Sequence, residues 1–333
     1  MVQVSIIMPL YNKKQYVEKV INAIIDQTYQ DWELIVVNDG SSDGSEKIVQ
    51  QMNQKDDRIK LINQENKGVS EARNKALQFA KGKWIWFVDA DDIPQKDFLK
   101  NALEERLDDV EIIVGSFDRY YENQEIQHIK IEEKAICEGI DISTLFMKYQ
   151  YKNGYWGYLW NKLIRKELIL NGNIEFEKNL KLAEDLKFMI QLYRLDPRVK
   201  IVSCCAMRYT VDAYNSSKEE KIDYYAQMHI QMMVYDWIIR EKEQMVFENH
   251  LKRIISNYAG CIIFHAYESG DDYKQKALKL MRETKTMDLL ITDGIDKIMK
   301  PIVKGLKEEN LRKIEIYLNG RSLIRKLYRK IKS

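Results

Sequence analysis

The chain has 333 residues, more than one hydrophobic core usually holds, so we expect one large domain with a second unit attached. Its 53 Lys and Arg residues nearly balance 51 Asp and Glu residues, which gives no positive field for nucleic acid, and no nucleic-acid partner is expected. The apolar runs are far shorter than the roughly 18 residues of a membrane span. The four cysteines are not spaced as in a disulfide framework or a zinc site, so we expect a reducing compartment and a cytoplasmic location.

The first 116 residues alternate short runs rich in Ile, Val, Leu and Trp with amphipathic segments. This alternation is typical of βαβ units around a mostly parallel sheet. It predicts strands at 4–8, 32–38, 58–62, 83–88 and 111–114. It predicts helices between them, at about 13–27, 45–53, 70–80 and 95–107.

The order becomes mixed after residue 116. Residues 117–136 partly alternate around a polar break, which predicts a hairpin inserted after the parallel strands. The rest of the first domain, to about residue 213, is expected to hold a segment at 161–169, a helix near 184–195 and a strand at 199–210. Residues 214–333 follow a helical pattern with Met and Tyr at core spacing, which predicts a helical C-terminal region.

Three carboxylates, Asp89, Asp91 and Asp92, directly follow the apolar run at 84–88. After a parallel strand they would lie at the carboxyl edge of the sheet, where α/β folds bind ligands. No Lys or Arg occurs between residues 84 and 95, so the cluster needs a cation from elsewhere. Mn²⁺ or Mg²⁺ fits, because one or two carboxylates with substrate phosphates commonly hold these ions. An Asp-rich turn that caps the next helix is the structural alternative.

Another carboxylate, Asp39, follows the expected strand at 32–38 and begins a turn rich in Gly and Ser that ends at Ser45. The turn is neither GxGxxG nor a P-loop, since no Gly-Lys-Ser or Gly-Lys-Thr follows. This pattern disfavours dinucleotide oxidoreductases and nucleoside triphosphatases.

Five motifs, in order, resemble those of bacterial family-2 glycosyltransferases. They are Pro9-Leu10-Tyr11-Asn12, the turn at 38–45, Gly68-Val69-Ser70-Glu71-Ala72-Arg73-Asn74, Asp89-Ala90-Asp91-Asp92 and Ala183-Glu184-Asp185. Each is weak alone, but five in register over about 210 residues make coincidence improbable. The resemblance implies the GT-A fold, with a Rossmann-like mixed sheet, and transfer of a sugar from a nucleotide diphosphate donor.

The resemblance also implies roles for single residues of the donor site. Tyr11 would line the base pocket, and Asp39 would accept the uracil imide hydrogen of a UDP-sugar. Arg73 would lie near the nucleotide, Asp89 close to the ribose and metal, and Asp91 would be the main metal ligand. The same motifs contribute Pro9, Asn12 and Ala90 to donor binding. For Arg73, which suits an anionic diphosphate, a helix-surface ion pair is the alternative.

The pair Glu184 and Asp185 resembles the family's acidic catalytic pair, which implies that Asp185 is the general base of an inverting single displacement. Two acids favoured by a helix N-terminus are the structural alternative. Asn38 and Ala183 depart from the Asp and Gly that many relatives carry. The QxxRW motif of processive relatives is absent, so one sugar per encounter is expected.

Residues 149–162 carry six aromatic side chains in fourteen positions. Because sugars stack on aromatic rings, this stretch is interpreted as the wall of a saccharide acceptor site. Trp156, Trp160 and Lys162 are assigned to it together with Glu184. An aromatic core beneath a loop is the alternative, since aromatic residues also dominate cores.

The C-terminal segment Arg321 to Lys332 has six basic residues and no acid. On a helix its apolar residues share one face and its Lys and Arg residues the other, which is the pattern of a helix that lies on an anionic membrane surface. A terminal helix packed on its own domain is the alternative.

The sequence thus predicts an inverting glycosyltransferase of capsular or exopolysaccharide assembly, with a GT-A domain at 1–213, of which 1–116 bind the donor and 117–213 hold the acceptor and base region. The acceptor could be lipid-linked, and the enzyme peripheral on the inner face of the plasma membrane. The rivals are a sugar-nucleotide nucleotidyltransferase, whose Gly-rich, Lys-bearing N-terminal loop is absent, and a non-catalytic glycan-binding module.

Overall fold

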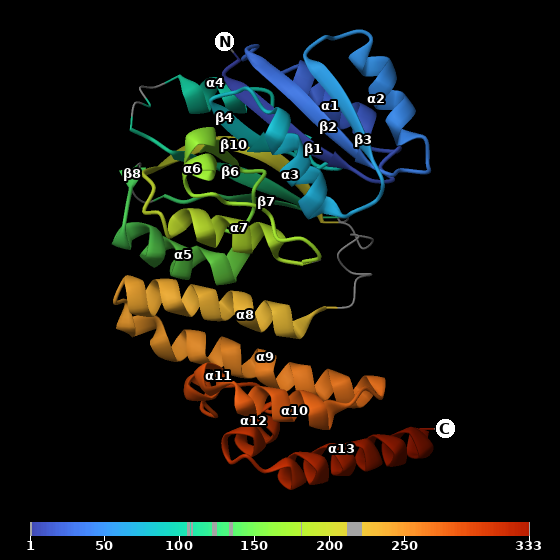
Figure 1. Cartoon of the computed structure of the whole chain (residues 1–333), viewed down its shortest axis with the longest axis vertical. Coiled ribbons are helices and arrows are strands. Elements are labelled where there is room, and N and C mark those ends of the chain that lie inside the picture. The colour runs from blue at the N-terminus through green and yellow to red at the C-terminus, as the bar shows by residue number, and fades with distance from the viewer. Residues whose placement is uncertain are drawn as a thin grey trace. The chain divides into compact units, whose positions relative to one another are not determined.

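The computed structural model describes residues 2–104, 107, 109–121, 125–132, 136–180, 182–211 and 222–332. The chain forms two compact units, Met1–Lys221 and Ile222–Ser333 (Figure 1). The expected end of the first domain at residue 213 lies outside the described residues.

Unit 1 is built on a ten-stranded mixed sheet. Eight strands follow the order β3-β2-β1-β4-β9-β6-β10-β5, and the other two lie off this path, with β7 paired to β6 and β8 paired to β10. Its first half is parallel, with β1 paired to both β2 and β4, and β2 paired to β3. Strand β9 is antiparallel to β4 and β6, β10 is parallel to β6, and β5 is antiparallel to β10. The bounds are β1 Val4–Leu10, β2 Trp32–Asp39, β3 Ile59–Gln64, β4 Trp84–Phe87, β5 Ile93–Pro94, β6 Ile112–Tyr121, β7 Ile126–Ile129, β8 Ile136–Cys137, β9 Lys162–Arg165 and β10 Val199–Val211.

The central strands are apolar because helices cover both faces of this half of the sheet. Every residue of β2 is buried, as expected for a strand between two helical layers. Helices α1 (Val17–Ile25) and α2 (Ser45–Asn53) contact each other, and α3 (Val69–Phe79) packs on β1 and β2. Right-handed crossovers put α3 on the opposite face from α1 and α2, since the chain reverses direction across the sheet after β3.

The expected parallel strands and the helices between them are all present, with three marked differences in length. The helix expected at 13–27 is shorter, since α1 begins at Val17 and ends at Ile25. Strand β6 continues to Tyr121, because the expected hairpin is formed by β6 itself with β7. The helix expected at 95–107 shortens to α4 (Phe98–Leu103). Its start is displaced because Ile93 and Pro94 pair with β10 and the Gln95 N–H donates to the Ala206 carbonyl at 3.0 Å.

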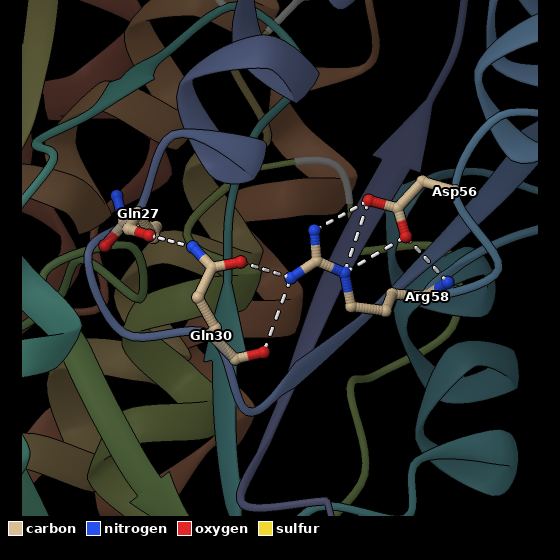
Figure 2. Close-up of polar contacts among 4 residues, drawn as sticks. All are labelled: Gln27, Gln30, Asp56 and Arg58. Atoms are coloured by element: carbon tan, nitrogen blue, oxygen red, sulfur yellow. Dashed lines mark hydrogen bonds and ion pairs between the residues drawn. The ribbon is translucent and has the colours of Figure 1, made fainter.

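The amino edge of the sheet is fastened by Arg58, at the entrance to β3 (Figure 2). Its guanidinium donates to both oxygens of Asp56, with Nη2–Oδ2 at 2.7 Å, and Nη1 donates to Gln30 Oε1 at 2.6 Å. Gln30 in turn donates to the Gln27 carbonyl. The guanidinium also lies 3.8 Å from the centre of the Trp32 ring. This network joins the loops before β2 and β3 at the end of the sheet opposite the carboxylate motifs.

The second half of unit 1 adds α5 (Ile140–Asn153), α6 (Lys166–Asn171) and α7 (Glu184–Tyr193). Its core is aromatic: Phe176 and Phe188 stack at 4.1 Å between ring centres, and both rings meet Phe87 of β4 edge-on. These contacts hold the start of α7, which carries the acidic pair, against the end of β4.

Unit 2 is helical, as expected. It contains α8 (Tyr224–Tyr235), α9 (Glu248–Ser269), α10 (Tyr273–Arg282), α11 (Thr284–Leu289), α12 (Lys300–Lys307) and α13 (Leu311–Lys332), with a π-helix at Asp236–Glu241 and a 3-10 helix at Met245–Phe247. Met228 and Met232 of α8 are buried against α9, which confirms their core role. Within the described residues no helix is both long enough and apolar enough to cross a membrane.

Candidate active site

The candidate site lies where the order of the parallel strands reverses. The chain moves from β1 outward to β2 and β3, then returns to β4 on the other side of β1. Loops that follow neighbouring strands on either side of such a point diverge and leave a crevice at the carboxyl ends of the strands. The motifs after β1, β2 and β4 all end at this edge of the sheet.

The loops after β1 and β2 are tied together by hydrogen bonds that involve Asn12. Its backbone N–H donates to Ser41 Oγ at 3.1 Å, and its side-chain oxygen accepts from the Ser42 N–H at 2.9 Å. Pro9 lies near the end of β1 and is partly exposed. Beside it the Tyr11 side chain is 50% exposed. The structure therefore presents the Tyr11 ring at the surface, where a flat ligand can reach it.

Asp39, the last residue of β2, is buried and already accepts three hydrogen bonds. Oδ1 accepts from Gln64 Nε2 and the Lys67 N–H, both at 2.8 Å, and Oδ2 accepts from the Gly68 N–H at 2.8 Å. A carboxylate has about four acceptor positions. The three bonds fix the orientation of Asp39 at the start of α3 and leave capacity for one more donor.

Asn38, where many relatives carry Asp, is used within the fold. Its side-chain amide donates to Asn63 Oδ1 at 2.9 Å, and its oxygen accepts from the Ser41 N–H at 3.0 Å. An Asn can provide the donor and the acceptor at once, which a carboxylate cannot. This departure is therefore explained by the contact between the ends of β2 and β3.

The carboxylates after β4 receive cations from distant parts of the chain. Lys13 Nζ, in the loop after β1, lies 2.5 Å from Asp91 Oδ2, and both side chains are partly exposed. Ala90 between the carboxylates is buried. Burial and the charges of Asp89 and Asp91 raise the pKa of Asp92 well above its usual range. The sequence showed no nearby cation because Lys13 is 78 residues away.

Arg73 joins the two acidic motifs. From the buried face of α3, its Nη2 donates to Asp89 Oδ1 at 2.9 Å, and its Nη1 donates to Asp185 Oδ1 at 2.5 Å and Glu184 Oε1 at 3.1 Å. Only 3% of its side chain is exposed, which contradicts the helix-surface ion pair considered as an alternative. Arg73 thus brings the end of β4 and the start of α7 into one charged cluster.

The cluster holds three carboxylates around one guanidinium. Burial alone would lower the pKa of Arg73, but Asp185, Asp89 and Glu184 raise it, so Arg73 stays charged. Burial raises the pKa of Asp185 well above that of an ordinary carboxyl group; Arg73 opposes this shift, and Glu184 and Asp89 add to it. A carboxylate with a raised pKa is a better proton acceptor near neutral pH.

Ala183, where many relatives carry Gly, adopts a left-handed conformation with φ of 62° directly before the acidic pair. This conformation costs an L-residue about 1–2 kcal/mol, whereas Gly adopts it freely. The positive φ at this position therefore explains why many relatives carry Gly here. Alanine keeps the turn, so α7 begins at Glu184 and presents both acids to Arg73.

Three residues expected to face an acceptor are buried, which corrects that expectation. Trp156 is fully buried and packs edge-on against Tyr193 at 5.5 Å. Trp160 is 3% exposed, and its carbonyl accepts from Trp86 Nε1 at 2.7 Å. The alternative of an aromatic core holds for both indoles, because Tyr193 packs on Trp156 and Phe117 packs on Trp160 at 4.7 Å.

Lys162 is also fully buried, and its ammonium points into the protein. Nζ donates to the carbonyls of Tyr155 and Tyr158, at 2.9 and 2.5 Å, and to Asn161 Oδ1 at 2.7 Å. Burial lowers its pKa, while Asp185 favours the charged form. Three acceptors satisfy the three N–H groups of an ammonium, so Lys162 fastens the loop before β9 and does not face a ligand.

Two residues near the site were missed by the sequence analysis. Lys13 directly follows the motif at Tyr11 and Asn12. Its position in the loop after the first strand is the signal in the sequence that could have identified it. Tyr209 lies on β10, one residue beyond the pairing of Arg208 with Ile93. No local pattern marks Tyr209, because only the antiparallel pairing of β10 with β5 brings it beside Asp92.

Residues 5–170 match the family model of glycosyl transferase family 2. The chain is 32% identical to the uncharacterized glycosyltransferase EpsJ of Bacillus subtilis, over 60% of this chain and 58% of EpsJ. It is 30% identical to the glycosyltransferase GlyA of Streptococcus pneumoniae, over 59% of this chain and 29% of GlyA. The chain thus spans well under two thirds of either relative. Through its amino-terminal unit, the chain belongs to glycosyltransferase family 2.

A solved structure of residues 1–349 of TarS from S. aureus, in complex with UDP-GlcNAc, resembles this chain with a TM-score of 0.68 and 19% identity, over 96% of this chain and 92% of that one. A TarS structure in complex with UDP gives a TM-score of 0.64. At this identity the likeness bears on the fold alone, and it confirms the expected GT-A fold.

Proposed function

We propose that the chain is an inverting glycosyltransferase that moves one sugar from a UDP-sugar to a hydroxyl of a saccharide in bacterial surface-polysaccharide synthesis. The observation that carries the proposal is the buried Arg73, whose guanidinium lies 2.9 Å from Asp89 of the donor motif and 2.5 Å from Asp185. A donor site and a base must be neighbours for direct transfer, because the two reacting atoms must meet in one crevice.

The choice of donor rests on two residues of the crevice, exposed Tyr11 and buried Asp39, and on the relatives. Tyr11 offers an exposed ring for a nucleobase, and the oriented carboxylate of Asp39 has capacity for one more N–H donor. TarS was solved with UDP-GlcNAc and with UDP. We therefore propose that the donor of this chain is a UDP-sugar, and we do not assign its sugar.

The carboxylates of Asp91 and Asp89 fit a divalent ion. Both are partly exposed, with Asp91 at 36% and Asp89 at 31%, and both already attract cationic groups. Within the described residues no group of three Asp, Glu, His or Cys side chains could hold a metal. Two carboxylates suffice where substrate phosphates supply further ligands. When bound, Mn²⁺ or Mg²⁺ would neutralise charge on the departing diphosphate.

Asp185 is proposed to accept the proton. The acceptor oxygen forms a bond to the anomeric carbon while the bond from that carbon to the diphosphate oxygen breaks, and the hydroxyl proton passes to the Asp185 carboxylate. The raised pKa of Asp185 supports this role. Arg73 keeps the carboxylate in a single orientation, and Glu184 shares Arg73 with it.

The proposed location is the inner face of the plasma membrane, where a lipid-linked acceptor could be reached. On α13, Ile316, Leu323 and Ile324 are 60 to 64% exposed, whereas Ile314 and Leu318 are buried. The helix therefore packs on unit 2 by one face and leaves a different apolar face uncovered. The five basic residues of the tail that follow Arg321 complement an anionic lipid surface.

The reaction is tested by measuring UDP release from a panel of UDP-sugars with Mn²⁺, with and without saccharide acceptors. Asp185→Asn is expected to keep UDP affinity and to lose roughly 10² to 10⁴ in turnover, because it removes proton acceptance. Glu177→Gln, at an exposed acid before α7, is the matched control and should retain turnover. Turnover of Asp185→Asn within a few-fold of the wild type would assign the base elsewhere.

A further inference from the structure

A small aromatic cluster lies beside the carboxylates after β4. The Trp160 ring stacks on Tyr158, with 4.7 Å between centres and 19° between planes, and on Tyr209, with 5.7 Å and 18°. The two tyrosine rings are 6.1 Å apart. Trp160 is buried, whereas Tyr158 and Tyr209 are partly exposed. The cluster thus has a fixed centre and two rings that reach solvent.

The sheet register brings this cluster to the metal motif. Strand β10 runs antiparallel to β5, with Arg208 opposite Ile93 and Met207 opposite Pro94. The next step along this register sets Tyr209 beside Asp92. In agreement, burial, Tyr158 and the nearby charges of Asp92 and Asp91 raise the pKa of Tyr209 to about 12, against the effect of Arg119.

The rings are held by contacts that leave little freedom. Gly154 has φ of 72°, and a Cβ built there would lie 2.8 Å from the Tyr158 ring, so only glycine admits this ring. The Lys162 ammonium donates a hydrogen bond to the Tyr158 carbonyl. Arg119 Nη2 lies 3.4 Å from the Tyr158 hydroxyl. A preorganised surface of this kind loses little entropy when a ligand binds.

The cluster lies on the side of the carboxylates away from the proposed nucleotide site. The proposed nucleotide site is at the ends of β2, β1 and β4, whereas β10 follows β9 and β6 beyond β4 in the strand order. Asp91 is therefore flanked by Tyr11 and Asp39 on one side and by Tyr209 on the other. The nucleotide donor would occupy the side of Tyr11 and Asp39. The side of Tyr209 therefore remains for the saccharide acceptor.

We propose that Tyr158 and Tyr209, supported by buried Trp160, form the platform on which the saccharide acceptor stacks. The C–H face of a pyranose packs on the tyrosine rings, and its hydroxyls meet the phenols and the Arg119 guanidinium, as amphipathic aromatic residues allow. This assignment rests on the proposed function. It replaces Trp156, Trp160 and Lys162, which are buried, as the residues that contact the acceptor.

The first test separates acceptor binding from donor chemistry. Tyr209→Leu is expected to raise the acceptor KM roughly 3- to 10-fold, which corresponds to about 0.7–1.4 kcal/mol. The double variant Tyr158→Leu/Tyr209→Leu should raise it further, because it removes both rings on which the sugar is proposed to stack. Acceptor-independent hydrolysis of the UDP-sugar should stay within two-fold. Tyr209→Phe keeps the ring and should stay near the wild type, and Tyr267→Leu in unit 2 is the matched control.

The second test needs no turnover and so separates this proposal from the proposed function. Saturation-transfer NMR would be recorded with chitobiose, cellobiose, lactose and maltose on the full chain loaded with UDP and Mn²⁺. Signal transfer to at least one disaccharide in the wild type, lost in Tyr209→Leu at an unchanged melting temperature, supports the platform. Transfer to none of the four, or equal transfer in both proteins, would overturn it.

Discussion

At the scale of single residues, the site is organised by cations that come from far along the chain. Lys13 pairs with Asp91 across 78 residues, and Arg73 pairs with Asp185 across 112. Each pair joins two motifs that are separate in the sequence. The buried Arg73 matters more to the arrangement than a surface pair would, because removing it leaves three carboxylates together without their shared cation.

The metal assignment gives a prediction for Asp91. Asp91→Asn removes one of two carboxylates proposed to hold the ion, so UDP affinity in Mn²⁺ is expected to fall at least tenfold, to the level that the wild type shows in EDTA. Isothermal titration calorimetry of UDP with and without Mn²⁺ measures both. Asp57→Asn, at an exposed acid before β3, should bind as the wild type does. Equal UDP affinity in EDTA and Mn²⁺ would contradict the assignment.

At the scale of secondary-structure elements, α13 divides into a packed and an uncovered face. Ile314 and Leu318, one helical turn apart, are buried in unit 2. The same face continues at Arg321, whose guanidinium lies 5.5 Å from the centre of the Phe264 ring. Ile316, Leu323 and Ile324 lie on another face and stay exposed. The exposed apolar residues are therefore available to enter a membrane interface.

This division gives a prediction for the tail. Leu323→Gln/Ile324→Gln is expected to lower binding to phosphatidylglycerol vesicles roughly tenfold or more, because each side chain loses most of its transfer free energy. The melting temperature should not change, since both residues are exposed. Co-sedimentation at low and high salt measures binding, and salt should weaken it.

Leu318→Gln is the contrasting variant, because it replaces a residue that is 1% exposed. It should lower the melting temperature by burying an unsatisfied amide. If the Leu323 and Ile324 substitutions lower the melting temperature and leave vesicle binding unchanged, the uncovered face serves the fold and the membrane proposal is wrong.

At the scale of the whole molecule, every residue proposed for donor and acceptor belongs to unit 1, whose described residues carry the sheet and both acidic motifs. We therefore expect that UDP with Mn²⁺ slows amide exchange at the ends of β1, β2 and β4 and at the start of α7. Ligand binding suppresses the local opening of the segments that it contacts. Hydrogen exchange with mass spectrometry, with UDP alone as the control, measures this, and equal protection throughout residues 222–332 would contradict it.

The sequence alone determined the elements of the parallel half and predicted that the motifs after β1, β2 and β4 meet at one edge of the sheet. Helix α2 begins and ends where it was expected, at Ser45 and Asn53, and the strands differ by one to two residues except for β6. These features depend on local patterns: apolar runs, helical periodicity and polar residues that follow a strand. Asp39 and the carboxylates at 89–92 could be assigned to one edge because the carboxyl ends of parallel strands lie together.

Only the tertiary structure decided which groups meet and which are covered. Trp156 and Trp160 have the residue types of a sugar-binding wall, yet burial assigns them to the core, because exposure depends on what packs over a side chain. Lys162 bonds inward for the same reason. Lys13 and Tyr209 reach Asp91 and Asp92 through strand pairing between segments far apart in the chain, and such long-range pairing leaves no local signal in the sequence.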